Sequence, residues 1–216
     1  TDGTINTTAT SANVDAGFSI STYTGTGIAA TIGHGLSKAP EMFIVKNREA
    51  GGTGSGNWNV FVTVIDGSMD ELALSTTGAK VDRSETLPTA SVISIGTSDE
   101  RNQSGIDYLA YCFHSVDGYS KVGSYTGNSS ADGTFVYLGF RPAFVMWKKT
   151  NSADDWGIHD NKREESTNAN PIDNYLRPNE SAVEGDDGDS VDFLSNGFKW
   201  RLSSGLRNNS GDTYIY

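Results

Sequence analysis

The chain has 216 residues, with 27 acidic against 16 basic side chains and a formal net charge of −11. This length can bury one or two hydrophobic cores without disulfides or metals, and the negative charge argues against binding a nucleic-acid backbone or an anionic membrane surface. There is no apolar run of membrane-spanning length. The single cysteine, Cys112, lies in an apolar segment and is expected to be a buried thiol rather than a nucleophile.

The predicted elements are almost all strands. Residues 1–15 are rich in Thr, Asn, Ala and Ser without periodicity, and they are interpreted as a linker from an upstream region. Short segments rich in Val, Ile, Thr, Tyr and Phe then alternate with Gly and Asn turns, as half-buried strands do. The predicted strands are residues 18–23, 29–33, 42–47, 57–64, 92–96, 108–115, 120–125, 134–138, 144–149, 156–159, 192–194, 198–202 and 214–216. Residues 69–74 and 172–176 are each predicted as a single helical turn. The sequence therefore predicts an all-β fold of antiparallel β-sandwich type.

The sequence also contains an internal duplication. Tyr23-Thr24-Gly25 recurs as Tyr125-Thr126-Gly127, and Pro40 recurs as Pro142, both at an offset of 102 residues. A period this long predicts a duplicated domain or half-domain rather than a solenoid. The two β repeats are predicted at residues 16–116 and 117–216, as two sandwiches or as one shared core. The last strand of the second copy is predicted to be truncated, which would leave an exposed sheet edge.

Catalytic patterns are weak. Three histidines, His34, His114 and His159, show no zinc-ligand spacing. The Gly-rich residues 51–56 precede a predicted strand, so a flexible hairpin is favoured over a phosphate-binding loop. No Ser, His and Asp set suggests acyl transfer, and Asp154-Asp155-Trp156 is a weak candidate for the paired carboxylates of glycoside hydrolysis. We therefore predict a protein without enzymatic activity.

Aromatic residues suggest a sugar-binding site in the second copy, because such sites stack rings on pyranose faces and bind hydroxyls with polar side chains. The alternative is that the tryptophans form the core, since Trp156 matches Trp58 across the repeat. His34, in a Gly-His-Gly turn, is either a local ligand contact or a partner of the backbone. The candidate ligand-binding residues are Trp147, Asn151, Asn170, Asn174, Tyr175, Arg177, Trp200 and His34.

Residues 184–192 form an acidic segment with two glycines. Asp186, Asp187, Asp189 and Asp192 supply hard oxygen ligands close together, which favours a calcium site. The alternative is a solvated acidic loop. No other cofactor is predicted.

The second copy resembles a known family. Residues 117–128 (DGYSKVGSYTGN), 135–145 (FVYLGFRPAFV), 173–176 and 191–198 resemble the tandem-repeat C-terminal region of marine bacteriophage tail-fibre-like virion structural proteins. That region is often found behind a concanavalin A-like lectin domain. The resemblance covers residues 16–216, and the acidic segment 184–189 departs from it.

The resemblance implies a virion component that acts outside the cell, as part of a tail fibre or another surface appendage. It implies a homotrimer that contacts other virion subunits and a host-surface glycan or protein, without membrane insertion. We therefore expect an adhesion or structural module that binds its receptor through loops. The alternatives are a purely structural spacer or capsid decoration protein, and a polysaccharide depolymerase.

Overall fold

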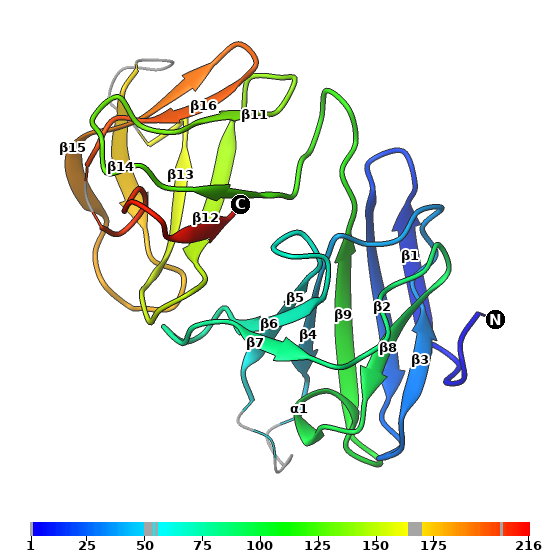
Figure 1. Ribbon diagram of the computed structural model, residues 1–216. Helices are drawn as coiled ribbons and strands as arrows, with labels where there is room; N and C mark the ends of the chain where they lie inside the picture. Colours follow the sequence, from blue (N-terminus) through cyan, green and yellow to red (C-terminus); the bar gives the residue numbers. More distant parts are fainter. Residues whose placement is uncertain (1, 50–53, 55, 164–169, 204) are drawn as a thin grey trace. The chain divides into compact units, whose positions relative to one another are not determined.

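The structure is a computed structural model that describes residues 2–49, 54, 56–163, 170–203 and 205–216 (Figure 1). The side chains of Asp187 and Asp189 also lie outside the described part. The chain divides into two compact units. Unit 1 comprises Thr1–Leu74 and Val81–Val116, and unit 2 comprises Ser75–Lys80 and Asp117–Tyr216.

Unit 1 contains two antiparallel sheets. Its elements are β1 (Ala9–Asn13), β2 (Phe18–Thr24), β3 (Ala30–Gly33), β4 (Met42–Asn47), β5 (Trp58–Val62), β6 (Met69–Ala73), β7 (Val81–Arg83), β8 (Val92–Gly96), α1 (Asp99–Asn102) and β9 (Asp107–Phe113). One sheet has the order β1-β2-β9-β4-β5-β6-β7, and the other is the pair β3-β8. Ile32 and Ile93 of the pair share one core cluster with Phe43 and Tyr108 of the large sheet, so the two sheets pack face to face.

Unit 2 is built from one antiparallel sheet. Its strands are β10 (Ser124–Thr126), β11 (Phe135–Tyr137), β12 (Phe144–Lys149), β13 (Trp156–Asp160), β14 (Ile172–Leu176), β15 (Gly185–Leu194), β16 (Gly197–Trp200) and β17 (Thr213–Ile215). The sheet order is β10-β17-β12-β13-β14-β15-β16-β11. Tyr125 on the edge strand β10 lies 6.1 Å from Phe198 and 6.2 Å from Trp200 on β16, measured between ring centroids. The sheet therefore curls around a single core.

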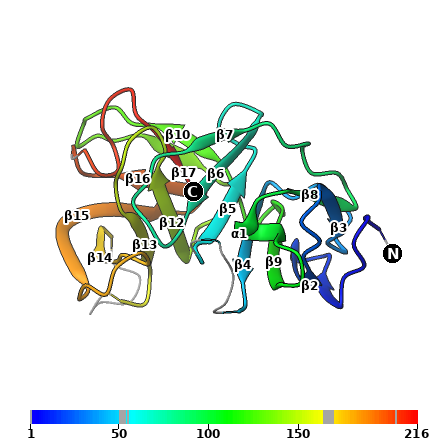
Figure 2. The same cartoon turned by 90° about the horizontal axis from the view of Figure 1, so that it is seen from below.

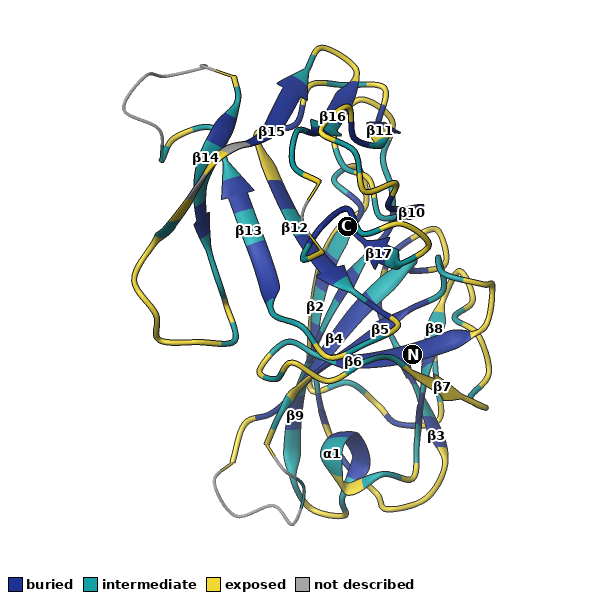
Figure 3. Cartoon of the chain, turned by 60° about the vertical axis from the view of Figure 1, so that its left-hand side comes forward, coloured by how far each residue is buried: buried dark blue, intermediate teal, exposed yellow. Residues whose placement is uncertain are grey.

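The all-β antiparallel fold predicted from the sequence is confirmed. Strict alternation of buried and partly buried residues along β9 shows why, because period-2 patterning buries one face of a strand. The short strand β7, by contrast, is exposed throughout (Figure 3). In the described part of the chain, no helix has the length and apolar character needed to cross a membrane.

Several expectations about individual segments are corrected. The two predicted helical turns are strands β6 and β14, since both segments pair with neighbouring strands. The N-terminal segment is not a linker, because Ile5 is buried in the core of unit 1 and β1 pairs with β2. Strand β17 lies between β10 and β12, so no sheet edge is exposed there.

The two units share an arrangement of buried tyrosines. In unit 1 the hydroxyl of Tyr23 donates to the carbonyl oxygen of Arg101 at 2.6 Å, and in unit 2 that of Tyr125 donates to the carbonyl oxygen of Arg207 at 2.7 Å. Each tyrosine ring also stacks on another buried tyrosine, with centroids 5.3 Å and 5.0 Å apart. These equivalent contacts are what a duplication predicts.

A buried asparagine follows each of these arginines. In unit 1, Asn102 donates to the carbonyl oxygens of Ile28 and Gly96, both at 2.6 Å. In unit 2, Asn208 donates to the carbonyl oxygens of Ser130 and Leu202 at 2.9 and 3.0 Å. The amide oxygen of each asparagine accepts a backbone N–H, from Thr26 and from Asn128 respectively. Each side chain thus ties together loops that are far apart in the sequence.

We predict that Tyr125→Phe lowers the free energy of unfolding of unit 2 by about 1–2 kcal/mol, because the buried Arg207 carbonyl loses its donor. Tyr23→Phe should weaken unit 1 to a similar extent. Urea unfolding followed by fluorescence measures both effects. The control is Tyr137→Phe, since Tyr137 is 67% exposed and should change stability by less than about 0.5 kcal/mol. Equal stability of Tyr125→Phe and wild type would contradict this account.

Candidate ligand-binding hollow in unit 2

Strand β15 is the main difference between the two units. It has ten residues and pairs with both β14 and β16, so the sheet of unit 2 continues through it (Figure 2). In unit 1, β7 has three residues and pairs with β6, while β8 pairs with β3 in the separate sheet. The segment expected to be an acidic loop is therefore part of a strand in the interior of the sheet of unit 2.

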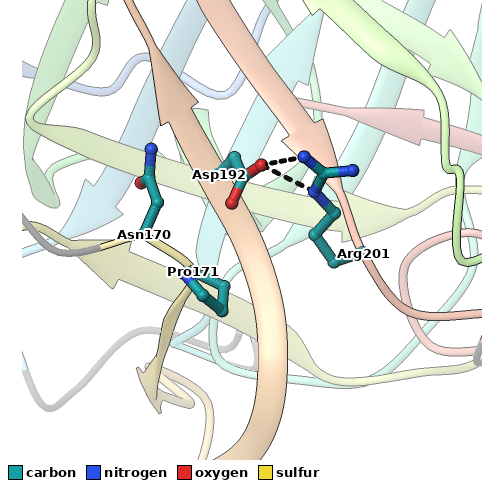
Figure 4. Close-up of a pocket in the computed structure, with 4 residues that line it drawn as sticks. All are labelled: Asn170, Pro171, Asp192 and Arg201. Atoms are coloured by element: carbon teal, nitrogen blue, oxygen red, sulfur yellow. Dashed lines mark hydrogen bonds and ion pairs between the residues drawn. The ribbon is translucent and has the colours of Figure 1, made fainter.

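A hollow of about 490 Å³ lies beside this strand (Figure 4). The described residues that line it are Asn170, Pro171, Asp192 and Arg201. Asn170 and Pro171 directly precede β14, Asp192 lies on β15, and Arg201 directly follows β16. Three neighbouring strands thus position the lining side chains, and the volume falls in the range typical of small-ligand sites.

Asn170 fixes one wall of the hollow. Its amide oxygen accepts the backbone N–H of Phe193 at 2.9 Å, and its amide nitrogen donates to the carbonyl oxygen of Phe193 at 3.1 Å. This pair of bonds substitutes for strand pairing near the register shift between Ile172 and Asn174. The Asn170–Pro171 peptide bond is cis. Asn170, a residue proposed from the sequence as a ligand contact, therefore lies in the hollow but uses its amide to hold β15.

Asp192 and Arg201 form the polar wall. Asp192 Oδ2 accepts hydrogen bonds from Arg201 Nε at 2.6 Å and from Nη2. The Arg201 side chain is 39% exposed, whereas that of Asp192 is 9% exposed. Asp192 Oδ1 and Arg201 Nη1 make no hydrogen bond with the described residues. The pair therefore presents one acceptor and one donor that a ligand can use.

The predicted aromatic residues do not form a binding surface. Trp147, Tyr175 and Trp200 are 2%, 6% and 0% exposed, and their rings surround the guanidinium of Arg207 at 5.1, 4.7 and 5.9 Å from its central carbon. Such contacts stabilise a buried cation. These rings belong to the core, as the alternative interpretation expected, and cannot stack on a sugar. Trp58, which was expected in the core together with Trp156, is 37% exposed.

The remaining predicted polar contacts bind other protein groups. Asn151 donates to Asp212 Oδ1 at 2.8 Å, and Asn174 donates to the carbonyl oxygen of Arg163 at 3.3 Å. Arg177 donates to the hydroxyl of Tyr175 at 2.7 Å and forms an ion pair with Asp155 at 3.2 Å. None of these residues lines the hollow, so the structure does not bring together the site proposed from the sequence.

His34 has a structural role in unit 1. It is fully buried, its Nδ1 accepts the backbone N–H of Leu36 at 3.1 Å, and its Nε2 therefore donates to the carbonyl oxygen of Thr89 at 3.1 Å. Burial lowers the pKa of His34 from 6.5, and the hydrogen bond to Thr89 opposes this effect. Both ring nitrogens are thus bonded to the backbone.

Ser190 and His159 are buried and in contact, as a nucleophile and its general base would be. The direction of their hydrogen bond, however, does not fit that role. Trp147 Nε1 can only donate, so His159 Nδ1 accepts its hydrogen at 3.1 Å and the imidazole proton sits on Nε2. That N–H donates to Ser190 Oγ at 3.2 Å, and Arg207 donates to the same oxygen at 2.6 Å. Because both groups donate to Ser190, His159 does not accept the serine proton.

We predict that His159 makes unit 2 sensitive to acid. Burial, and to a lesser extent Arg207, lowers the pKa of His159 well below 6.5. As the pH falls below about 6.5, the unfolded chain binds a proton that the folded unit excludes, and the free energy of unfolding drops by up to about 1.4 kcal/mol per pH unit.

Urea unfolding of wild type and His159→Gln between about pH 8 and pH 5.5 measures this effect. The variant should be less stable at the higher pH but lose less stability on acidification. His34 is present in both proteins, so its contribution cancels in the comparison. Identical pH slopes for the two proteins would overturn the assignment.

The calcium site proposed for the acidic segment is not assembled by the described side chains. The carboxylate of Asp192 is bound to Arg201, and Asp186 Oδ1 accepts the backbone N–H of Gly188 at 2.9 Å. The side chains of Asp187 and Asp189 lie outside the described residues. Among the described residues, the group of three close carboxylates is in unit 1: Asp66, Asp70 and Asp82, each of which has a further interaction.

We predict that calcium does not bind to the Asp192 carboxylate, because Arg201 already compensates its charge. An ion bound to the folded state would raise the midpoint of thermal unfolding by mass action. The change in the midpoint of thermal unfolding between calcium chloride and a chelator should therefore be the same in wild type and in Asp192→Asn. A calcium-dependent rise that Asp186→Ala removes would restore the calcium site.

The family model for a domain of unknown function, DUF7483, matches residues 1–216. The chain belongs to this family. The match spans both units, so the DUF7483 domain includes the pair and not one unit alone. No curated protein and no solved structure matches the chain.

Proposed function

We propose that this chain is a non-enzymatic adhesion module of a bacteriophage tail fibre or another virion appendage, and that it binds a glycan on the host surface. The observation that carries the binding role is the hollow of unit 2, where an exposed donor and an accessible acceptor stand side by side. Asp192 lies within β15 and Arg201 directly follows β16, so paired strands hold both groups in place before a ligand binds. The virion context rests on the sequence resemblance.

Multiple copies would supply the affinity. A hollow with a few polar contacts supports a weak site, with a dissociation constant of about 1 mM. A homotrimeric appendage that displays several copies would gain about 10² to 10⁴ in avidity. In this proposal the partners are other virion subunits and a host glycan, and the module acts outside the cell.

A purely structural role is the second candidate, and exposed aromatic residues favour it. Phe135 and Tyr137 lie on the edge strand β11 and are 41% and 67% exposed, and Phe144 at the start of β12 is 56% exposed. Edge strands with exposed apolar residues are suited to contacts with other subunits. An adhesion module could also make such contacts. Only the absence of glycan binding would therefore favour the purely structural role.

The depolymerase alternative needs two carboxyl groups about 5–9.5 Å apart on either side of a bound sugar. The described lining of the hollow contains one carboxylate, that of Asp192, and Arg201 binds it. This arrangement favours ligand binding over hydrolysis.

A glycan array probed with a multimerised form of the chain tests the proposal. We expect binding to a limited set of glycans, equal with calcium and with chelator, and without release of reducing sugar from the bound glycans. Silence across an array that includes envelope polysaccharides of marine bacteria would favour the structural role. Release of sugar fragments would favour the depolymerase.

A further inference from the structure

We infer that the hollow in unit 2 binds a neutral sugar residue through two adjacent hydroxyl groups, one donating to Asp192 Oδ1 and the other accepting from Arg201 Nη1. This inference rests on the proposed glycan-binding function and specifies the class of ligand and the residues that bind it.

The Asp192–Arg201 pair retains hydrogen-bonding capacity beyond its own contact. The pair uses Oδ2 of the aspartate and Nε and Nη2 of the arginine for its own contact. Oδ1 can still accept and Nη1 can still donate, and both belong to charged groups, whose hydrogen bonds are stronger than those of neutral groups. A hydroxyl group both donates and accepts, so two neighbouring hydroxyls match this acceptor and donor.

The charges of the Asp192–Arg201 pair favour a neutral ligand. The ion pair is formally neutral, and Asp192 lies in contact with the guanidinium that an anionic ligand would seek. A carboxylate on the ligand would therefore meet like-charge repulsion from Asp192, and the net charge of −11 on the chain adds to it. A cationic ligand would meet the corresponding repulsion from Arg201. A neutral ligand avoids both penalties.

The walls of the hollow include an apolar surface and are held in place by hydrogen bonds. The ring of Pro171 contributes an apolar surface without a hydrogen-bond donor, which suits the C–H face of a sugar ring (Figure 4). Asn170 is held by its two bonds to Phe193, and Arg201 is anchored by its backbone N–H, which donates to Ser190 at 2.9 Å. Binding therefore requires little ordering of the protein, which lowers its entropic cost.

The experiment is a binding titration of the unmultimerised chain with methyl glycosides of the common neutral hexoses, measured by calorimetry and by saturation-transfer NMR. Each hexoside that binds is compared with two relatives: a deoxy analogue that lacks one of two adjacent hydroxyls, and the corresponding uronic acid. We expect at least one neutral hexoside to bind, with its deoxy analogue and its uronic acid about tenfold weaker or worse.

Variants then place the site. Arg201→Gln and Asp192→Asn should weaken binding of that hexoside by about tenfold or more. The matched control is Arg177→Gln, because Arg177 is also partly exposed in unit 2 and paired with a carboxylate but does not line the hollow. Circular dichroism and thermal melting establish that each variant is folded. The deoxy analogue tests the same contact on wild-type protein, in case Asp192→Asn does not fold.

The inference is overturned if no neutral hexoside binds, if the uronic acids bind better, or if wild type, Arg201→Gln and Asp192→Asn bind equally. Array binding that persists in the folded Arg201→Gln variant would keep the adhesion function and move its site away from the hollow. If the hollow binds a hexoside but the array shows no glycan binding, the inference about the hollow stands and the proposed adhesion function is rejected.

Discussion

Buried polar groups need partners, and this constraint organises both units. Asn102 and Asn208 are fully buried, and the amide group of each is hydrogen-bonded to backbone groups of separate loops. The nearby arginines are equally buried but are stabilised differently. Arg101 forms ion pairs with Glu71 and Glu85, whereas Arg207 lies among aromatic rings and donates to Ser190. The same framework thus accommodates a carboxylate-rich interior in one unit and an aromatic interior in the other.

Strand β15 determines where the two units differ in surface chemistry. Its pairing with β14 and β16 brings the segment before β14 and the segment after β16 to the same place. Asn170 and Arg201 are 31 positions apart in the chain, yet they line one hollow with Asp192 between them. In unit 1, β7 pairs with β6 at the edge of the large sheet, whereas β8 belongs to the other sheet. The hollow therefore depends on the pairing of β15 with both β14 and β16, which brings its lining residues together.

More of the fold than of the candidate site could be predicted from the sequence. Segments rich in Val, Ile, Thr, Tyr and Phe identified β2 and β9, and each of these strands buries one face. Tyr23 and Tyr125, which match in the sequence, make equivalent hydrogen bonds. The sequence predicted only residues 192–194 of β15, since the Asp and Gly residues before them disfavour strands unless tertiary pairing overrides this preference. The role of the tryptophans could not be predicted, because the sequence does not distinguish a tryptophan that stacks on a sugar from one that packs in the core. The position of Arg201 near Asp192 could have been predicted from the sequence. A turn after Leu194 places the segment that contains Asp192 opposite the segment that ends before Arg201.

Because the sheet of unit 2 is continuous, local opening should require different changes in the two units. In unit 1 the pair β3-β8 belongs to a separate sheet, so it can separate from the large sheet without breaking the pairing of that sheet. In unit 2 the corresponding movement of β16 and β11 would break the backbone hydrogen bonds between β15 and β16. Amide hydrogen exchange depends on such openings. Slow exchange across β15 and β16 would mean that this wall of the hollow persists on the timescale of global unfolding rather than of local fluctuation.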